Sequence, residues 1–268
     1  MGVVIEGTAV VDPAAELGDG VQIGAGCYVG AGVVIGDRTV LMAGACVYGP
    51  SVLGKENVIY PRAVLGTGPQ DLGYRGEPTR LEVGDGNEFR EFVSVNRGTV
   101  KGGGITRVGH RGLFMACSHI AHDCQVGDRV VMANSALLAG HVHVGDGAVI
   151  NGAAAFHHFV SVGRMAYVGG MSRVVHDVPP FVKVEGNPAR VRMLNAVGLR
   201  RQGLDAARIE ALDGAVRRLF RGHMPLRVAV EEIEREVMTD DVRHLVDCIK
   251  RSMATRKGRY LEEFRKQV

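Results

Sequence analysis

Bulky apolar residues recur at every sixth position over the first two thirds of the chain. The series is Ile5, Val11, Leu17, Ile23, Val29, Ile35, Leu41, Val47, Leu53, Ile59 and Leu65, then Val83 and Val95, then Val108, Phe114, Ile120, Val126, Met132, Leu138, Val144, Ile150, Phe156, Val162, Val168 and Val174. An amphipathic helix would space its apolar residues by three and four, and an alternating strand by two. A period of six instead predicts hexapeptide repeats that wind into a parallel β-helix, with one short strand and one turn per repeat.

The turns of these repeats are marked by glycine. Glycine directly follows the apolar position in pairs such as Ile23-Gly24, Val126-Gly127 and Val162-Gly163. Glycine makes sharp turns at no steric cost, because it has no Cβ. The glycine positions therefore support the same repeat as the apolar positions.

The repeat slips once. The spacing from Leu65 to Val83 and from Val83 to Val95 is a multiple of six, whereas Val95 and Val108 are thirteen residues apart. Lys101 and three consecutive glycines lie within this interval. We therefore expect an excursion from the coil between Val95 and Val108, and excursions from a rigid scaffold often carry functional residues.

The period changes to that of helices near the C-terminus. Pro179-Pro180 interrupts regular pairing, and the turn-forming segment 185–189 leads us to divide the chain into a β-helix at 1–188 and a helical domain at 189–268. Three amphipathic patterns predict helices: Ile209, Leu212, Val216, Leu219 and Phe220; then Val228, Val230, Ile233 and Val237; then Val242, Leu245, Val246 and Ile249. We expect these helices to cover the open end of the solenoid or to join subunits.

Composition excludes several classes of protein. The net charge is only +3, and the region 200–268 holds 16 of the 32 Lys and Arg with 12 of the 29 acids, which is typical of solvated helices and disfavours nucleic-acid binding. The five cysteines form no C-x-x-C pair, so we expect neither a disulfide framework nor a zinc ribbon, and a cytoplasmic location. We see no signal peptide and no apolar run of membrane-spanning length.

Candidate chemistry comes from a cluster of histidines. Six of the ten lie within forty residues of the solenoid: His119, His122, His141, His143, His157 and His158. In a three-sided coil, residues eighteen apart stack at the ~4.8 Å spacing of a β ladder, which places His122, Gly140 and His158 in one column. Asp123 follows His122 directly. The column thus predicts a general base, a carboxylate that orients it, and an accessible backbone N–H at Gly140 for an oxyanion.

Longer motifs carry a resemblance to a known family. They are His119-Ile120-Ala121-His122-Asp123-Cys124, Gln70-Asp71-Leu72, Gly76-Glu77-Pro78-Thr79-Arg80, Asn96-Arg97-Gly98-Thr99, Ala139-Gly140-His141-Val142, Asp177-Val178-Pro179-Pro180 and Gly186-Asn187-Pro188. With these motifs the chain resembles, over its whole length, the UDP-N-acetylglucosamine O-acyltransferases that begin lipid A biosynthesis. The hexapeptide period alone is shared by many acyltransferases, whereas the histidine run together with the Gln-Asp-Leu loop is far more specific.

The resemblance implies a left-handed β-helix, a cytoplasmic homotrimer with sites between subunits, and transfer of a 3-hydroxyacyl chain from acyl carrier protein to the 3-hydroxyl of the UDP-sugar. It implies no cofactor, no metal and no stable membrane insertion. It assigns His122 as general base, Asp123 as its orienting carboxylate and Gly140 as oxyanion donor. It also implies that substrate is contacted by Gln70, Asp71, His119, His141, His157, Asn195 and Arg201, and that Gly170 limits the acyl chain.

Four positions depart from the family pattern and leave alternatives open. Gly73, Asn96, Val197 and Gln202 stand where the family often has a lysine, a histidine, a glutamate and a second arginine. A UDP-2,3-diamino sugar acylated on nitrogen is therefore a second candidate acceptor. A divergent paralogue that binds the carrier protein or the sugar nucleotide without turnover is another alternative. A zinc hydratase on a hexapeptide helix is a third, although its usual histidine spacing is missing.

Overall fold

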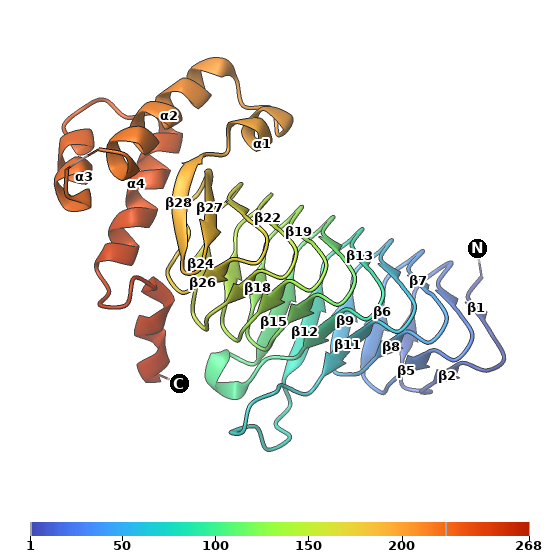
Figure 1. Ribbon diagram of the computed structural model, residues 1–268. Coiled ribbons are helices and arrows are strands. Elements are labelled where there is room, and N and C mark those ends of the chain that lie inside the picture. The colour runs from blue at the N-terminus through green and yellow to red at the C-terminus, as the bar shows by residue number, and fades with distance from the viewer. Residues whose placement is uncertain (1, 223, 268) are drawn as a thin grey trace.

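The computed structural model describes residues 2–222 and 224–267. Three parallel sheets, A, B and C, form the sides of a left-handed β-helix, and a group of helices lies at its C-terminal end (Figure 1). The N-terminus lies at the opposite end of the solenoid (Figure 1). The fold predicted from the six-residue period and the resemblance is confirmed.

Each sheet takes one strand from every coil. In spatial order, sheet A consists of β1 (Val4–Ile5), β4 (Gln22–Ile23), β7 (Val40–Leu41), β10 (Val58–Ile59), β13 (Glu88–Phe89), β16 (Leu113–Phe114), β19 (Val131–Met132), β22 (Val149–Ile150), β25 (Tyr167–Val168), β27 (Val182–Gly186) and β28 (Ala189–Leu194). Sheet B consists of β2 (Val10–Val11), β5 (Tyr28–Val29), β8 (Cys46–Val47), β11 (Val64–Thr67), β14 (Ser94–Asn96), β17 (His119–Ile120), β20 (Leu137–Leu138), β23 (Ala155–Phe156) and β26 (Arg173–Val174). Sheet C consists of β24 (Ser161–Val162), β21 (His143–Val144), β18 (Gln125–Val126), β15 (Ile105–Val108), β12 (Arg80–Val83), β9 (Ser51–Leu53), β6 (Val33–Ile35) and β3 (Glu16–Leu17).

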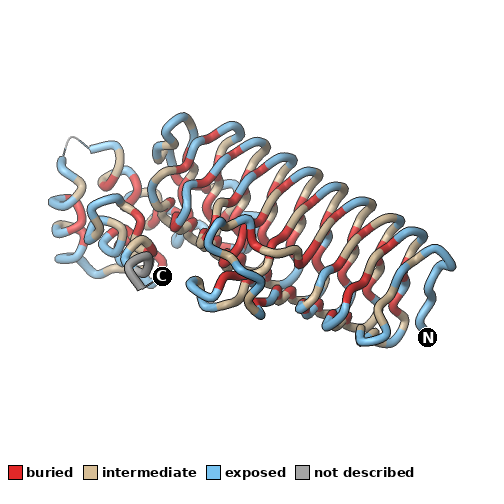
Figure 2. The backbone as a smooth tube through the Cα atoms, turned by 90° about the horizontal axis from the view of Figure 1, so that it is seen from below, coloured by how far each residue is buried: buried red, intermediate tan, exposed pale blue. Residues whose placement is uncertain are grey.

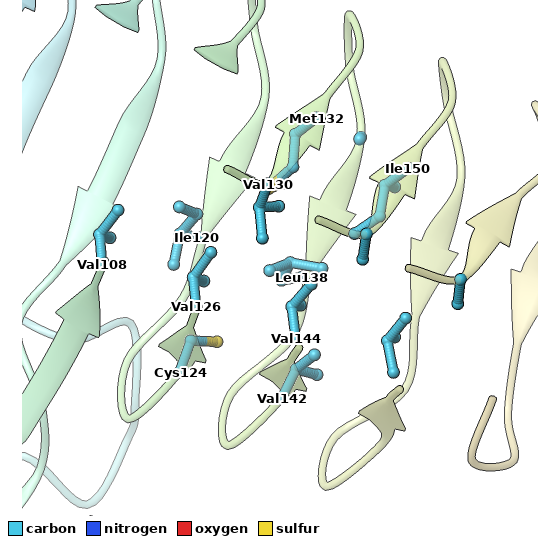
Figure 3. Packing of buried hydrophobic residues seen from close by; sticks show 14 of the residues in the cluster. Val108, Ile120, Cys124, Val126, Val130, Met132, Leu138, Val142, Val144 and Ile150 are labelled. Carbon is cyan, nitrogen blue, oxygen red and sulfur yellow. The ribbon is translucent and has the colours of Figure 1, made fainter. Parts of the chain in front are cut away.

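The six-residue period places one apolar side chain per strand inside the prism. From Ile23 onward every member of the predicted series is buried, and Phe89 joins it. Figure 2 shows this as buried segments that recur along the coils that follow the first one. Figure 3 shows side chains of successive coils, among them Ile120, Leu138 and Ile150, converging in the interior. Burying one such side chain contributes roughly 1.5–3 kcal/mol, which makes this interior the main source of stability.

Residues eighteen apart in regular coils are neighbours in one sheet. His119 pairs with Leu137, and Gln125 pairs with His143. Each edge of the prism is a column of turns, and we name the edges by the sheets that they join. The B–C edge includes the turns 121–124, 139–142 and 157–160. This register brings widely spaced side chains together on one edge.

Two excursions leave the coil, both at the B–C edge. The second excursion, residues 97–104, confirms the insertion predicted between Val95 and Val108, and contains the 3-10 turn η1 (Val100–Gly102). The first excursion, residues 68–79, joins β11 of sheet B directly to β12 of sheet C. One step between sheets normally takes six residues, so the eighteen residues from Leu65 to Val83 contain an insertion of twelve. Twelve is a multiple of six, and the spacing therefore concealed it.

The C-terminal part begins with a hairpin. Strand β28 pairs antiparallel with β27, so sheet A continues to Leu194 and the predicted division at residue 188 falls in the turn of this hairpin. The helices that follow are α1 (Ala196–Arg201), α2 (Ala206–Phe220), α3 (Leu226–Glu234), α4 (Asp240–Met253) and the 3-10 helix η2 (Tyr260–Gln267). The second predicted pattern extends too far, because Val237 lies beyond α3 and is fully exposed.

An ion-pair cluster ties these helices to the solenoid. Asp241 in α4 is buried and accepts from Arg164 of the solenoid at 2.9 Å and from Arg208 of α2 at 2.7 Å. Both arginines hold the pKa of Asp241 below its ordinary value, with the hydrogen bond from Arg208 as the main cause. None of the helices in the described parts of the chain is long and apolar enough to cross a membrane.

Candidate active site

The predicted histidine column lies on the B–C edge. The backbone N–H of His141 donates to the carbonyl of His122 at 3.0 Å, and that of Phe159 donates to the carbonyl of Gly140. These bonds stack the turns of β17, β20 and β23 directly on one another. His122, Gly140 and His158 therefore occupy equivalent positions in successive coils, as the eighteen-residue spacing predicted.

His122 and Asp123 form a buried pair. The Nδ1 atom of His122 lies 2.7 Å from Oδ2 of Asp123, and both residues are less than a tenth exposed. An ionised carboxylate only accepts hydrogen bonds, so Nδ1 carries the proton and Nε2 has the free lone pair. Nε2 has no hydrogen-bond partner in the described part of the chain. This is the arrangement of a histidine prepared to remove a proton.

Gly140 leaves room for the imidazole of His122. A Cβ added to Gly140 would lie 2.4 Å from Cε1 and 2.7 Å from Nε2 of His122. The ring therefore occupies the space where any other residue at position 140 would place its side chain. The N–H of Gly140 has no acceptor within residues 2–222 and 224–267, although Gly140 is buried and not exposed as the sequence led us to expect.

Asp123 is held by residues of the second excursion and of β15. Its Oδ1 accepts from the backbone N–H of Thr99 at 2.7 Å, its Oδ2 accepts from the Thr99 hydroxyl at 2.7 Å, and its own N–H donates to Thr106 Oγ1 at 2.8 Å. A Cβ on Gly102 would lie only 2.0 Å from Asp123 Cγ. The second excursion thus packs directly on the carboxylate. The break in the repeat located this excursion, and Thr99 belongs to one of the motifs that carry the resemblance, but neither observation assigned it to Asp123.

His141 lies beside the pair. Its Nε2 is 3.6 Å from Asp123 Oδ2, and its ring is perpendicular to that of His122 at 5.2 Å. The other face of His141 stacks on Phe159, with ring centroids 4.4 Å apart. Burial lowers the pKa of His141 below 6.5, against the attraction of Asp123. His141 is therefore expected to be neutral at pH 7, and eighteen-residue counting would have identified Phe159 as its neighbour.

His119 lies on the outer face of sheet B, in β17, three residues before His122. Its Nδ1 is 2.8 Å from Ser94 Oγ, and burial lowers its pKa. The next positions in its column are Leu137 and Ala155, which are both exposed. An apolar strip therefore runs from His119 along this face toward later coils.

The first excursion brings a carboxylate near the histidines. Asp71 Oδ1 accepts from the N–H of Gly73 at 2.6 Å. This bond is the largest cause that lowers the pKa of Asp71, and His122, Lys101 and His141 lower it further. Gln70, in the same excursion, is exposed. Asp71 therefore lies within electrostatic reach of the histidine pair.

The positions that depart from the family pattern have structural partners. Asn96 is buried and donates to Thr67 Oγ1 and to the carbonyl of Gly68, both at 2.8 Å, so it holds the base of the first excursion. A Cβ on Gly73 would lie 3.6 Å from Nζ of Lys101. Lys101 of the second excursion thus places a positive charge beside Gly73, where the family often has a lysine.

The remaining predicted residues lie elsewhere on the chain. His157 is exposed on the B–C edge, where its Nδ1 is 3.0 Å from the carbonyl of His158. Asn195 is buried at the C–A edge, where it caps α1 and donates to the carbonyl of Met165, and Arg201 is exposed at the end of α1.

The other departures and Gly170 also lie away from the His122 column. Val197 is half exposed on α1, and Gln202 donates to the carbonyl of Gly147 at the C–A edge. Gly170 lies on the A–B edge, where a Cβ would meet little besides the carbonyl of Gly152 at 3.3 Å. One chain therefore does not bring Asn195, Arg201 or Gly170 to the histidine column.

Comparison with known proteins identifies the family. The family model for the second domain of UDP N-acetylglucosamine O-acyltransferases matches residues 177–258, and the model for six bacterial transferase hexapeptide repeats matches residues 2–37. An acyl-[acyl-carrier-protein]–UDP-N-acetylglucosamine O-acyltransferase from Anaeromyxobacter sp. is 47% identical over 92% of this chain and 96% of the relative. The chain belongs to this O-acyltransferase family.

Solved structures agree with this family assignment. A UDP-N-acetylglucosamine acyltransferase from Bacteroides fragilis superposes with a TM-score of 0.89 at 35% identity, covering 92% of this chain and 97% of the other. The enzyme from Campylobacter jejuni gives a TM-score of 0.88 at 35% identity over 95% and 98% of the two chains. The O-acyltransferase fold therefore extends over almost the whole chain, including the helical part.

Three potential metal ligands also meet in this O-acyltransferase site. His122, Asp123 and His141 each offer one ligand atom, and these atoms lie within 4.8 Å of one another. Two ligand atoms on a tetrahedral zinc ion at 2.0–2.1 Å stand roughly 3.4 Å apart. The 2.7 Å between His122 and Asp123 is shorter than that and fits a shared proton. The geometry favours acid–base chemistry over the zinc alternative.

Proposed function

We infer that the protein transfers a 3-hydroxyacyl chain from acyl carrier protein to the 3-hydroxyl of UDP-N-acetylglucosamine, the first step of lipid A biosynthesis. The observation that carries this inference is the buried His122–Asp123 pair, with Nε2 of His122 unengaged, in a chain of the O-acyltransferase family. The free N–H of Gly140 directly beside the imidazole completes the set of groups that acyl transfer requires.

The chemistry follows from these positions. Nε2 of His122 removes the proton of the sugar hydroxyl as its oxygen attacks the thioester carbonyl, and the Gly140 N–H stabilises the resulting oxyanion. The imidazolium that forms keeps its Nδ1–H on Asp123, which stabilises the new positive charge. Collapse of the tetrahedral intermediate breaks the C–S bond, and the departing thiolate takes the proton from Nε2. His122 is thereby returned to its starting state.

The acyl chain is proposed to lie on the outer face of sheet B. Leu137 and Ala155 form the exposed apolar strip that begins at His119. Gly170 lies at the far edge of the same sheet, beyond this strip. Within the described residues a Cβ at position 170 would meet one tight contact, the carbonyl of Gly152 at 3.3 Å, and otherwise faces open space that a ligand or a second subunit could fill. These positions support Gly170 as the limit on acyl length.

A homotrimer would complete the site. His141 and His157 lie on the B–C edge, whereas Asn195 and Arg201 lie at the C–A edge of the same chain. Residues on different edges can contact one sugar nucleotide only if they come from neighbouring subunits. Three-fold association of a prism places unlike edges side by side, and the guanidinium of Arg201 suits phosphate recognition. We propose the cytoplasm as the location, where the predicted reducing environment fits the five free cysteines.

The test is a transfer assay with purified protein. Hydroxyacyl carrier proteins of graded chain length are incubated with UDP-N-acetylglucosamine or with the 2,3-diamino UDP-sugar, and the products are weighed by mass spectrometry. We expect an O-acylated product. Acylation of the diamino sugar alone would redirect the function to N-acyl transfer, and no product from any combination would indicate a binding protein without turnover.

His122→Ala should abolish this transfer without unfolding the protein. Loss of a general base typically lowers the rate by about 10²–10⁴. His244→Ala is the matched control, because His244 lies in α4, which contributes no residue to the proposed site. If His122→Ala keeps activity within a few fold of wild type, His122 is not the base.

A further inference from the structure

The second excursion contributes a threonine to the catalytic pair. Thr99 donates both its backbone N–H and its hydroxyl to Asp123, one to each carboxylate oxygen, at 2.7 Å. Thr99 and Asp123 are both buried, with 4% and 3% of their surface exposed. A hydrogen bond to a charged group in such an environment is stronger than one at the surface.

The hydroxyl of Thr99 has its direction fixed by a third bond. Its oxygen accepts from the N–H of Gly102 at 3.1 Å, which leaves its single proton for Asp123. Oδ2 of Asp123 therefore accepts from two donors, the Thr99 hydroxyl and the imidazole Nδ1–H of His122. The orientation of the histidine depends on this carboxylate, and the carboxylate depends on Thr99.

The second excursion packs closely against the carboxylate of Asp123. Gly102 packs so tightly against the carboxylate that a single added carbon would overlap Cγ. Thr99 lies outside the regular strands, in the segment that interrupts the six-residue period. The second excursion therefore packs on the carboxylate of Asp123, which belongs to the next coil.

We propose that Thr99 is a positioning residue for acyl transfer, which holds the carboxylate of Asp123 in the orientation in which it accepts from Nδ1 of His122, so that His122 presents Nε2 as the base. This inference rests on the proposed function. Thr99 acts through Asp123 and His122 and does not itself contact the reacting atoms.

The decisive variant is Thr99→Val, which keeps the shape and the backbone N–H of Thr99 and removes only the hydroxyl. We expect kcat to fall about tenfold or more, with little change in KM, because a hydrogen bond to a charged group is lost at the catalytic pair. Thr99→Ser restores the hydroxyl and should recover most of the rate. Should Thr99→Val fail to fold, the comparison of Thr99→Ala with Thr99→Ser replaces it.

The pH profile separates positioning from simple structural support. Asp123, His119 and His141 of the solenoid and Asp71 of the first excursion all face His122, and Lys101 lies beyond Asp71. Thr99→Val leaves these groups in place but removes a donor that stabilises the Asp123 anion. The anion then attracts the imidazole proton more strongly, so the acid limb of kcat/KM should move to higher pH, and Thr99→Ser should move it back.

Thr39→Val is the matched control. Thr39 is equally buried, donates to the carbonyl of Gly54 and accepts from the N–H of Asn57, far from the histidine column. The proposal is overturned if Thr99→Val keeps kcat within twofold of wild type with an unchanged pH profile, or if Thr39→Val loses as much rate. Absence of transfer by the wild type itself would instead refute the proposed function.

Discussion

Replacing Gly140 by alanine tests the geometry of the catalytic pair with a single methyl group. The new Cβ would lie 2.4 Å from Cε1 of His122, whereas ordinary contacts of this kind begin near 3.4 Å. One of the two groups must therefore move by about 1 Å. The backbone of Gly140 is not in the left-handed region, so alanine fits the main chain and the imidazole is the group that shifts.

A displaced imidazole should lose much of its catalytic effect. A misplacement of about 1 Å at a reacting group can lower the rate about 10²-fold. We expect Gly140→Ala to lower kcat by this factor in the acyl-transfer assay, while thermal unfolding stays close to that of wild type. Alanine retains its backbone N–H, so loss of the oxyanion donor would not account for the effect.

Two further variants check this reasoning. Gly7→Ala is the control, because a Cβ on Gly7 meets nothing within 4 Å in a turn of the first coil. The double variant Gly140→Ala with His122→Ala should be no slower than His122→Ala alone, since the alanine acts through the histidine. A folded Gly140→Ala enzyme with wild-type kcat would refute the placement of His122 as the base.

Three other predictions concern chain length, assembly and pH. Gly170→Met should favour shorter hydroxyacyl donors in a competition assay, since overpacking an apolar site costs about 1–3 kcal/mol, and an unchanged length profile would exclude the ruler role. Sedimentation at micromolar concentration should give a trimer, and a monomer would contradict the shared site. Burial lowers the pKa of His143 below 6.5, so between the two pKa values the unfolded chain binds a proton at His143 and the folded chain does not. The free energy of unfolding should therefore fall as the pH drops from 6.5 toward the lower pKa of the folded state. Thermal unfolding between about pH 7.5 and about pH 5.5 should show a smaller loss for His143→Gln, and an equal loss would assign the effect to other groups.

The sequence was sufficient to predict the coil and the central column of the site. A strict six-residue period allows only one pairing register, because a shift of one residue would expose the apolar series. Once the register is set, His122, Gly140 and His158 must stack, and counting in steps of eighteen gives their neighbours. The same counting reaches Phe159 from His141.

The six-residue period did not predict the first excursion or the path of either one. An insertion of twelve residues preserves the phase of a six-residue repeat, so the first excursion was hidden while the second, seven residues longer than a regular step, was visible. A repeat also gives no information on where an excursion folds. The contact of Thr99 with Asp123 therefore could not be read from spacing.

The amino-acid sequence by itself thus determined the solenoid, the predicted base and its carboxylate, because these depend on a short-range repeat that fixes its own register. Tertiary structure decided how the two excursions fold back onto the B–C edge, that Asn96 supports the first of them, and that sheet A continues through β28. These features depend on contacts between segments outside the repeat. Their energies come from individual hydrogen bonds and close packing, which no periodic pattern encodes.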